Sequence, residues 1–207
     1  MNQLYNSLQS GIEALGLKYD DHMLKQMLSY LALLNKWNKV YSLTNINDQE
    51  QMLYYHLLDG LTIIEQLEPY KEILDVGSGM GVPGIIVAIC YPHKHVTLLD
   101  SNSKKTAFLN QVKIELSLTN LEVVTSRIEN YRPQSKFACI IARAFSRVDT
   151  FISLCKSLLQ DHGVLIAMKS KEVMEEVELI KDQYQYELIS VNIPKVDDQR
   201  FLLKLKL

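Results

Sequence analysis

The chain lacks the long hydrophobic runs that would place it in or through a membrane. No window approaches the roughly 18 consecutive apolar residues that a membrane-spanning helix needs. Residues 1–11 also lack the basic and apolar regions of a signal peptide. We therefore expect a cytoplasmic protein with no membrane partner.

Cysteine is too scarce to build a disulfide or metal framework. The three cysteines, Cys90, Cys139 and Cys155, are odd in number, widely spaced and set in apolar runs. Isolated cysteines of this kind usually lie reduced in a protein core. We expect free buried thiols and no bound metal.

An excess of charge of either sign is also missing. The 22 Lys and Arg residues nearly balance 24 Asp and Glu residues, and the formal net charge is −2. Such a chain has no general attraction for polyanions, so a nucleic-acid site would have to concentrate its positive charge locally. With 207 residues, 47% of them hydrophobic, the chain can bury one full core and a small second one.

The first third of the sequence has the apolar periodicity of helices. Asp20 or Asp21 can cap the second of them, and residues 42–48 form a polar connector. We predict a helical N-terminal region over residues 1–68 that packs on the core. Its two apolar stripes are Leu24, Met27, Leu28, Leu31, Leu34 and Trp37, and then Met52, Leu53, His56, Leu57, Leu61 and Ile64.

After Pro69 short apolar runs alternate with helical segments, which predicts a parallel sheet with helices on both faces. The expected strands are 72–76, 95–99, 121–125, 137–142 and 163–168. The expected helices are 83–91, 103–117, 148–160 and 171–182. Two successive strands, 185–192 and 200–206, predict an antiparallel ending. This α/β arrangement, a doubly wound seven-stranded Rossmann-like sheet over residues 69–207, resembles class I methyltransferases.

A glycine-rich turn after the first strand predicts a nucleotide site. Gly79, Gly81 and Gly84 fit the G-x-G-x-x-G spacing of dinucleotide sites, with Asp100 at the end of the next strand for the ribose. An NAD-dependent oxidoreductase is therefore one alternative, although the chain shows no clear hydride-transfer residues.

Two features of the same turn favour S-adenosylmethionine instead. The first glycine after the strand is Gly77, so the spacing is G-x-G-x-G. Asp75, near the end of the strand, would repel a pyrophosphate but suits the cationic ammonium and sulfonium of S-adenosylmethionine. We therefore place Asp75, Gly77, Gly79 and Asp100 at this cofactor.

Cationic side chains follow every later strand of the parallel sheet. Because ligands bind at the carboxyl ends of such strands, this segregation predicts a polyanionic substrate. Arg143 lies within an apolar run and needs a partner, so it is the candidate catalytic residue. The candidate RNA contacts are Lys104, Lys105, Arg127, Arg147 and Lys169.

The segment after the fourth strand excludes two kinds of methyl transfer. Residues 142–145 read Ala-Arg-Ala-Phe and not the Asn/Asp-Pro-Pro-aromatic motif that methylates exocyclic amines. Methylation at pyrimidine carbon 5 needs a thiolate nucleophile, commonly in a Pro-Cys pair, and no cysteine of this chain follows a proline. A ring nitrogen such as guanine N7 fits, because its lone pair needs no general base and catalysis can rest on alignment.

Four motifs together resemble the bacterial 16S ribosomal RNA guanine-N7 methyltransferases, also called glucose-inhibited division protein B. They are D-V-G-S-G-x-G-x-P-G at 75–84, L-L-D-S at 98–101, S-R-x-E at 126–129 and A-R-A-F at 142–145. The resemblance covers nearly the whole chain and includes the W-N and L-T segment at 37–44 and the H-x-L-D segment at 56–59.

The resemblance implies methyl transfer from S-adenosylmethionine to nitrogen 7 of guanine 527 in 16S ribosomal RNA, with that RNA or the small ribosomal subunit as partner. We expect a monomer. A non-catalytic RNA-binding module is a further alternative, against which the intact acidic residues and Arg143 count. The implied cofactor contacts are Gly77, Val82, Ile128, Glu129 and Arg143, with Asp100 at the ribose.

Some positions depart from the family's usual residues. Ser42 and Gly60 lie in the helical region, where they affect its contacts rather than the cofactor site, and Lys105 and Ser170 also differ. His56 lies on an apolar helix face, where a hydrogen-bonded core histidine is favoured over a catalytic one.

Overall fold

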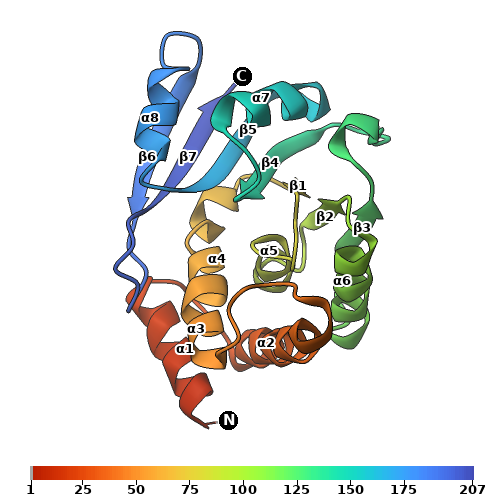
Figure 1. Cartoon of the computed structure of the whole chain (residues 1–207), viewed down its shortest axis with the longest axis vertical. Coiled ribbons are helices and arrows are strands. Elements are labelled where there is room, and N and C mark those ends of the chain that lie inside the picture. The colour runs from red at the N-terminus through yellow and green to blue at the C-terminus, as the bar shows by residue number, and fades with distance from the viewer. Residues whose placement is uncertain (1) are drawn as a thin grey trace.

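A seven-stranded sheet forms the centre of the computed structural model, which describes residues 2–207 (Figure 1). Met1, the first residue of the predicted helical region, lies outside the described residues. The strand order is β3-β2-β1-β4-β5-β7-β6. Strand β7 runs antiparallel to both of its neighbours, whereas β1 to β5 pair in parallel. The predicted doubly wound sheet with an antiparallel final strand is confirmed.

Most strand and helix bounds match the sequence pattern closely. The strands are β1 (Glu72–Val76), β2 (His95–Asp100), β3 (Leu121–Thr125), β4 (Phe137–Arg143), β5 (Leu159–Ser170), β6 (Gln185–Val191) and β7 (Arg200–Lys206). The helices between them are α5 (Gly84–Cys90), α6 (Ser103–Glu115), α7 (Val148–Cys155) and α8 (Val173–Glu178).

The largest error of the sequence reading lies between α7 and β5. The apolar periodicity predicts a helix to residue 160, but α7 ends at Cys155 and a short 3₁₀ turn, Lys156–Leu158, leads into β5. Leu159 already pairs with Phe137 of β4, across an irregularity in the register. Pairing with a neighbouring strand therefore overrides the local helical pattern.

The N-terminal region is helical, as predicted. Its elements are α1 (Asn2–Ala14), α2 (Asp21–Tyr41), α3 (Gln49–Met52), a π-helical segment (Leu53–Leu58), α4 (Asp59–Leu61) and a 3₁₀ turn (Ile64–Leu67). Asp20 caps α2, because its carboxylate accepts the Met23 N–H at 2.7 Å. The π-helical segment continues α3 into α4, and such segments often occur at functional sites.

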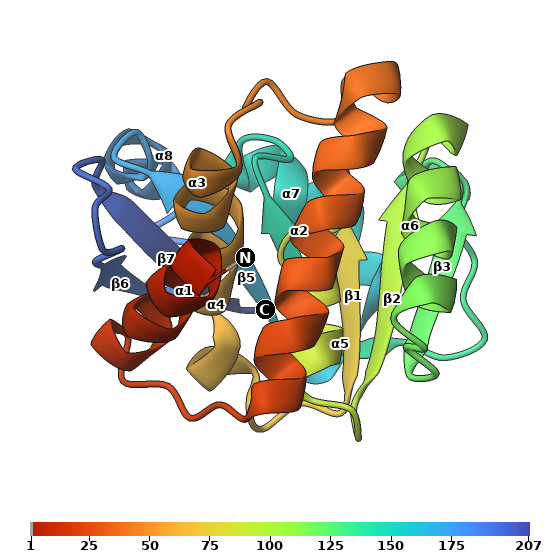
Figure 2. The same ribbon diagram turned by 90° about the horizontal axis from the view of Figure 1, so that it is seen from below.

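Two apolar cores lie on opposite faces of the sheet. The N-terminal helices, α5 and α6 cover one face, and α7 and α8 cover the other (Figure 2). Side chains of α2, such as Leu31, belong to the same buried cluster as Ile86 of α5 and Leu98 of β2. The helical region thus packs continuously on the sheet, and a domain boundary near residue 68 stays a prediction.

The cysteines are free, and Cys139 and Cys155 are buried while Cys90 is half-buried. Burial raises the pKa of the Cys90 and Cys155 thiols to about 12, so both are protonated at neutral pH. Over residues 2–207, no three His, Cys, Asp or Glu side chains group so as to hold a metal ion. Within the same range, none of the helices combines the length and apolarity required to cross a membrane.

Candidate functional site

The glycine turn after β1 has a backbone that only glycine adopts easily. Gly77, Gly79 and Gly81 have φ angles of 67°, 59° and 99°. A Cβ atom on Gly77 would come within 2.5 Å of the Phe145 ring, so this glycine lets the segment after β4 approach the turn. From α2, the Tyr30 hydroxyl donates to the Met80 carbonyl at 2.9 Å and ties the helical region to the turn.

Asp100 joins the glycine turn to the end of β2. One carboxylate oxygen accepts the Gly79 N–H and the other accepts the Asn102 N–H, each at 2.8 Å. The Leu99 carbonyl accepts the N–H groups of Gly77 and Ser78. Each carboxylate oxygen has a second lone pair, so Asp100 can also accept from the hydroxyls of a ribose.

A cavity of about 360 Å³ opens beside this turn and is called the cofactor cavity here. Four of the predicted cofactor residues, Gly77, Asp100, Ile128 and Glu129, line it together. Its apolar walls, which include Leu99 and Phe145, suit a flat base, whereas its carboxylates suit hydroxyl and cationic groups. Gly79 and Val82 do not line the cavity, and Val82 is instead buried next to Gly60.

Asp75 lies beneath the turn and not in the cofactor cavity. Its side chain is fully buried, and one oxygen accepts the N–H of Gly84, the first residue of α5, at 2.9 Å. The other oxygen has no hydrogen-bond partner in the structure. Burial raises the pKa of this carboxyl to about 7. The expectation of an Asp75 that faces the cofactor is corrected to a cap of α5, because the first N–H groups of a helix need acceptors.

A second cavity of about 330 Å³ adjoins the cofactor cavity at Ala144 and is called the acceptor cavity here. Arg143 lines it from the end of β4. Its Nε lies 2.9 Å from a carboxylate oxygen of Asp59, and its Nη2 donates to the Tyr55 carbonyl at 2.8 Å. Arg143 thus has the partner that its apolar setting requires. It lies at the acceptor cavity, and a contact with the cofactor stays a prediction.

Asp59 and Tyr55 are site residues that sequence reasoning did not identify. Both come from the helical region, and the Tyr55 carbonyl is 88 residues from Arg143 along the chain. The H-x-L-D segment at 56–59 was the available signal, because a carboxylate on an apolar helix face needs a partner as much as an arginine does. Only their position in space shows that they complete the site.

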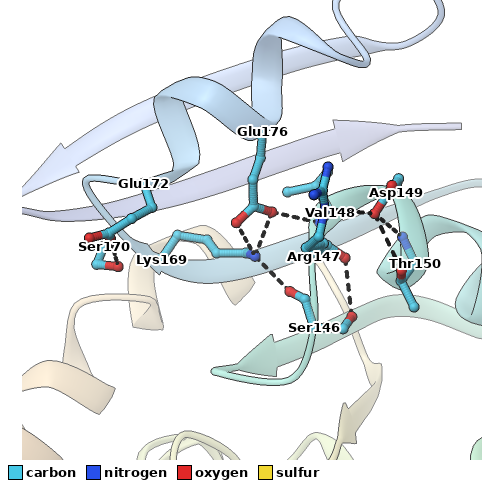
Figure 3. A network of polar contacts seen from close by, with 9 residues as sticks. All are labelled: Ser146, Arg147, Val148, Asp149, Thr150, Lys169, Ser170, Glu172 and Glu176. Carbon is cyan, nitrogen blue, oxygen red and sulfur yellow. Dashed lines mark hydrogen bonds and ion pairs between the residues drawn. The ribbon is translucent and has the colours of Figure 1, made fainter.

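Lys169 lies in the wall of the acceptor cavity and forms an internal ion pair there. Its ammonium lies 2.8 Å from a carboxylate oxygen of Glu176 and donates to the Ser146 carbonyl at 2.7 Å (Figure 3). The same carboxylate accepts the Val148 N–H at 2.6 Å. The Val148 N–H at the start of α7 recruits Glu176, and Glu176 in turn pairs with Lys169, so that an RNA contact of Lys169 stays a prediction.

Of the other predicted RNA contacts, two lie at the cofactor cavity and the rest follow the same strand ends. Lys104, Arg127 and Arg147 are exposed, and Lys105 is half-buried. Lys105 and Arg127 line the cavity itself. The Arg147 Nε lies 3.6 Å from a carboxylate oxygen of Asp149, which is a long ion pair (Figure 3).

His56 is a buried, hydrogen-bonded histidine of the helical region. Its Nε2 lies 2.9 Å from the Thr44 hydroxyl and its Nδ1 lies 3.0 Å from the Tyr55 carbonyl. Burial and the nearby Arg143 charge lower the pKa of His56 to about 4, so the ring is neutral at physiological pH. It lines neither the cofactor cavity nor the acceptor cavity.

The sheet order and the two adjoining cavities at its carboxyl edge define a class I methyltransferase. Solved structures share this fold. An O-methyltransferase from Bacillus cereus in complex with SAH superimposes with a TM-score of 0.63 at 14% identity, covering 100% of both chains. A SAM-dependent methyltransferase from Aquifex aeolicus gives a TM-score of 0.60 at 17% identity, covering 80% of this chain and 96% of the other.

The family model described as rRNA small subunit methyltransferase G matches residues 23–203. A protein of that name from Chromobacterium violaceum is 43% identical over 201 residues, covering 97% of this chain and 96% of its own length. The Pseudomonas aeruginosa protein is 44% identical over 202 residues, with 97% and 94% covered. The chain belongs to the rRNA small subunit methyltransferase G family, as the sequence motifs predict, and the oxidoreductase alternative is discarded.

Proposed function

We propose that the protein transfers a methyl group from S-adenosylmethionine to nitrogen 7 of guanine 527 in 16S ribosomal RNA. Its family membership carries the general activity, methylation of small-subunit ribosomal RNA. The observation that supports the particular reaction is the pair of cavities that meet at Ala144. The methyl donor in the cofactor cavity and the target base in the acceptor cavity would then lie next to each other.

The residues of the cofactor cavity fit S-adenosylmethionine, which supplies an electrophilic methyl group on a sulfonium when bound. Asp100 would accept from the ribose hydroxyls, and Ile128 and Phe145 provide apolar surface for the adenine. Gly77 keeps the turn free of a side chain where Phe145 approaches. Glu129 adds a second carboxylate to the lining of the cavity, which favours a cationic ligand.

The acceptor side is arranged for positioning rather than for proton removal. Neither cavity is lined by cysteine or histidine. Guanine N7 reacts through a ring lone pair, so no proton has to leave before the methyl group is transferred. The Arg143 guanidinium, held by Asp59 and the Tyr55 carbonyl, would orient the base, and alignment then supplies most of the rate enhancement.

The RNA would approach across the cationic rim formed by Lys104, Lys105, Arg127 and Arg147. We propose the small ribosomal subunit or its RNA as the partner, a monomeric enzyme, and action in the cytoplasm. Lys169 is left out of the rim because Glu176 neutralises it.

Two measurements test this function. Isothermal titration should detect binding of S-adenosylhomocysteine and none of NAD. Mass mapping of 16S ribosomal RNA should show a 7-methylguanine at position 527 in cells that carry the protein and an unmodified guanine in cells without it. NAD binding alone, or an unchanged position 527, would refute the proposal.

A further inference from the structure

The proposed function assigns the base that receives the methyl group to the acceptor cavity. Ala144 has a left-handed backbone with φ of 50°, and the residues on its two sides line different cavities. Phe145 lines the cofactor cavity and Arg143 lines the acceptor cavity. A base in the acceptor cavity would therefore face the cofactor cavity across Ala144.

The walls of the acceptor cavity suit a purine. Met168, Phe201 and Leu202 supply buried apolar surface from β5 and β7. Asp59 and Arg143 supply hydrogen-bonding groups from the helical region and β4. A volume of about 330 Å³ lies in the range of small-ligand sites.

Asp59 has an unused acceptor in this cavity. One carboxylate oxygen pairs with Arg143 Nε, whereas the other accepts no hydrogen bond from any residue in the range 2–207. The side chain is 5% exposed, and burial raises the pKa of its carboxyl. A buried carboxylate with a free oxygen gains from any further donor.

Glu176, the other carboxylate of the acceptor cavity, already uses both of its oxygens in hydrogen bonds. Its two oxygens already accept from Lys169, and one of them also accepts from the Val148 N–H. Among the described carboxylates of the cavity, Asp59 is therefore the better placed to bind a ligand.

Guanine has the matching pattern of donors. Its N7 and O6 acceptors share one edge, and its N1–H and 2-amino donors lie toward the opposite side of the ring system. If N7 faces the cofactor cavity, the two donors are turned toward the rest of the acceptor cavity. The Arg143 guanidinium, which lines the same cavity, is the complementary donor for O6. Adenine has the opposite pattern at these positions and would leave both groups unsatisfied.

We propose that the Asp59 carboxylate selects the target guanine by accepting hydrogen bonds from its N1–H and 2-amino groups. This inference rests on the proposed function, since it names how the same site recognises its base. It makes Asp59 a specificity-determining residue contributed by the helical region to the methyltransferase fold.

Base analogues test the proposal in the unaltered enzyme. Small subunits are reconstituted on 16S ribosomal RNA, prepared by ligation, that carries either guanosine or inosine at position 527. Inosine keeps N7, O6 and N1–H but lacks the 2-amino group. We expect single-turnover methylation of inosine to be at least about tenfold slower, the loss typical of one hydrogen bond to a charged group. Equal rates on the two particles would overturn the proposal.

Two variants separate recognition from structure. Asp59→Asn should slow methylation of guanosine and reduce the preference over inosine to within about twofold. Glu176→Gln, at a carboxylate of the same cavity whose oxygens are engaged, should keep the full preference. If Asp59→Asn does not fold, the comparison of guanosine and inosine in the unaltered enzyme decides the proposal by itself. A preference that survives the loss of Asp59 would refute the assignment.

The guanosine particle with the unaltered enzyme is the control for the underlying function. If it is not methylated at position 527, the proposed reaction is wrong. If it is methylated and inosine reacts equally well, the reaction stands and only the role of Asp59 fails.

Discussion

A few buried polar side chains hold the site together, and each depends on a partner in another element of the fold. Arg143 is paired with Asp59 and with the Tyr55 carbonyl, and Asp75 caps α5 from beneath the glycine turn. Their residue types indicate chemistry in the sequence. Their roles are set by what faces them, because a buried charge is stable only when its neighbours compensate it.

At the residue scale, His56 should make stability depend on pH. Its pKa is about 4 in the folded protein, against an ordinary value of 6.5, so the unfolded chain takes up a proton first as pH falls. The contribution of His56 to the free energy of unfolding is fully present above about pH 6.5. It is lost as the pH falls toward 4, and the total loss is about 3 kcal/mol. Urea unfolding at pH 7.5 and 4.5 measures it.

Comparison between variants isolates the histidine, because Asp75, with a raised pKa, acts in the opposite direction over the same range. His56→Gln should remove most of the acid loss relative to the unaltered protein. His22→Gln, at an exposed histidine, should leave the loss unchanged. Parallel pH profiles for the unaltered protein and His56→Gln would contradict the prediction.

At the scale of elements, a buried lysine ends the 3₁₀ turn Ile64–Leu67 before β1. The Lys94 ammonium, in a residue only 2% exposed, donates to the carbonyls of Leu67, Glu68 and Tyr70 at 2.9, 2.5 and 2.9 Å. It also lies 4.4 Å from the centre of the Tyr91 ring. The Leu67 carbonyl also accepts the Tyr70 N–H at 3.1 Å, whereas carbonyls at the end of a helix generally lack intrahelical partners, so the ammonium supplies donors where the helix stops.

Replacement of Lys94 by Met should therefore destabilise the fold. Three carbonyls lose a charged donor while the apolar stem stays, and we expect a loss of about 3 kcal/mol in the free energy of unfolding. Urea unfolding measures the change. Lys71→Met, at an exposed lysine nearby, is the matched control and should change stability by less than about 0.5 kcal/mol. Equal effects of the two substitutions would count against this role.

The elements themselves were predictable wherever local pattern and tertiary pairing agree. Strand β3 has the predicted bounds, 121–125, and Asp20 caps α2 as its sequence position indicates. The failure at residues 156–160 has a physical cause. The sequence pattern continues the predicted helix through residues 156–160, but Leu159 pairs with Phe137 of β4, and this strand pairing overrides the local pattern.

At the scale of the whole molecule, a slightly acidic chain presents a cationic rim around one cavity. Lys104 and Lys105 begin α6 beside the cofactor cavity. If each lysine contacts a phosphate, binding of small-subunit RNA should depend less on salt in the double variant Lys104→Ala/Lys105→Ala. We expect the slope of the logarithm of the binding constant against the logarithm of the salt concentration to fall by about 1.5 in magnitude. Filter binding at several salt concentrations gives the slope.

A variant of equal charge change provides the comparison for this rim. Lys71 precedes β1, at the opposite edge of the sheet, and Lys113 lies in the last turn of α6. Lys71→Ala/Lys113→Ala should leave the slope almost unchanged, because neither residue lies near the cofactor cavity. The rim has no part in RNA binding if both double variants behave alike.

The sequence by itself determined the succession of strands and helices along the chain, the glycine turn and the place of Asp100 at the end of a strand, because these follow from local patterns of apolar residues and glycine. Only the tertiary structure decided that Asp59 completes the acceptor cavity, that Asp75 is a helix cap, and that Lys169 belongs to Glu176. Those outcomes depend on which side chains meet once the helical region and the strands have packed together. Local periodicity does not say which side chains will face one another after packing, even where, as for Lys169 and Glu176, they are only seven residues apart.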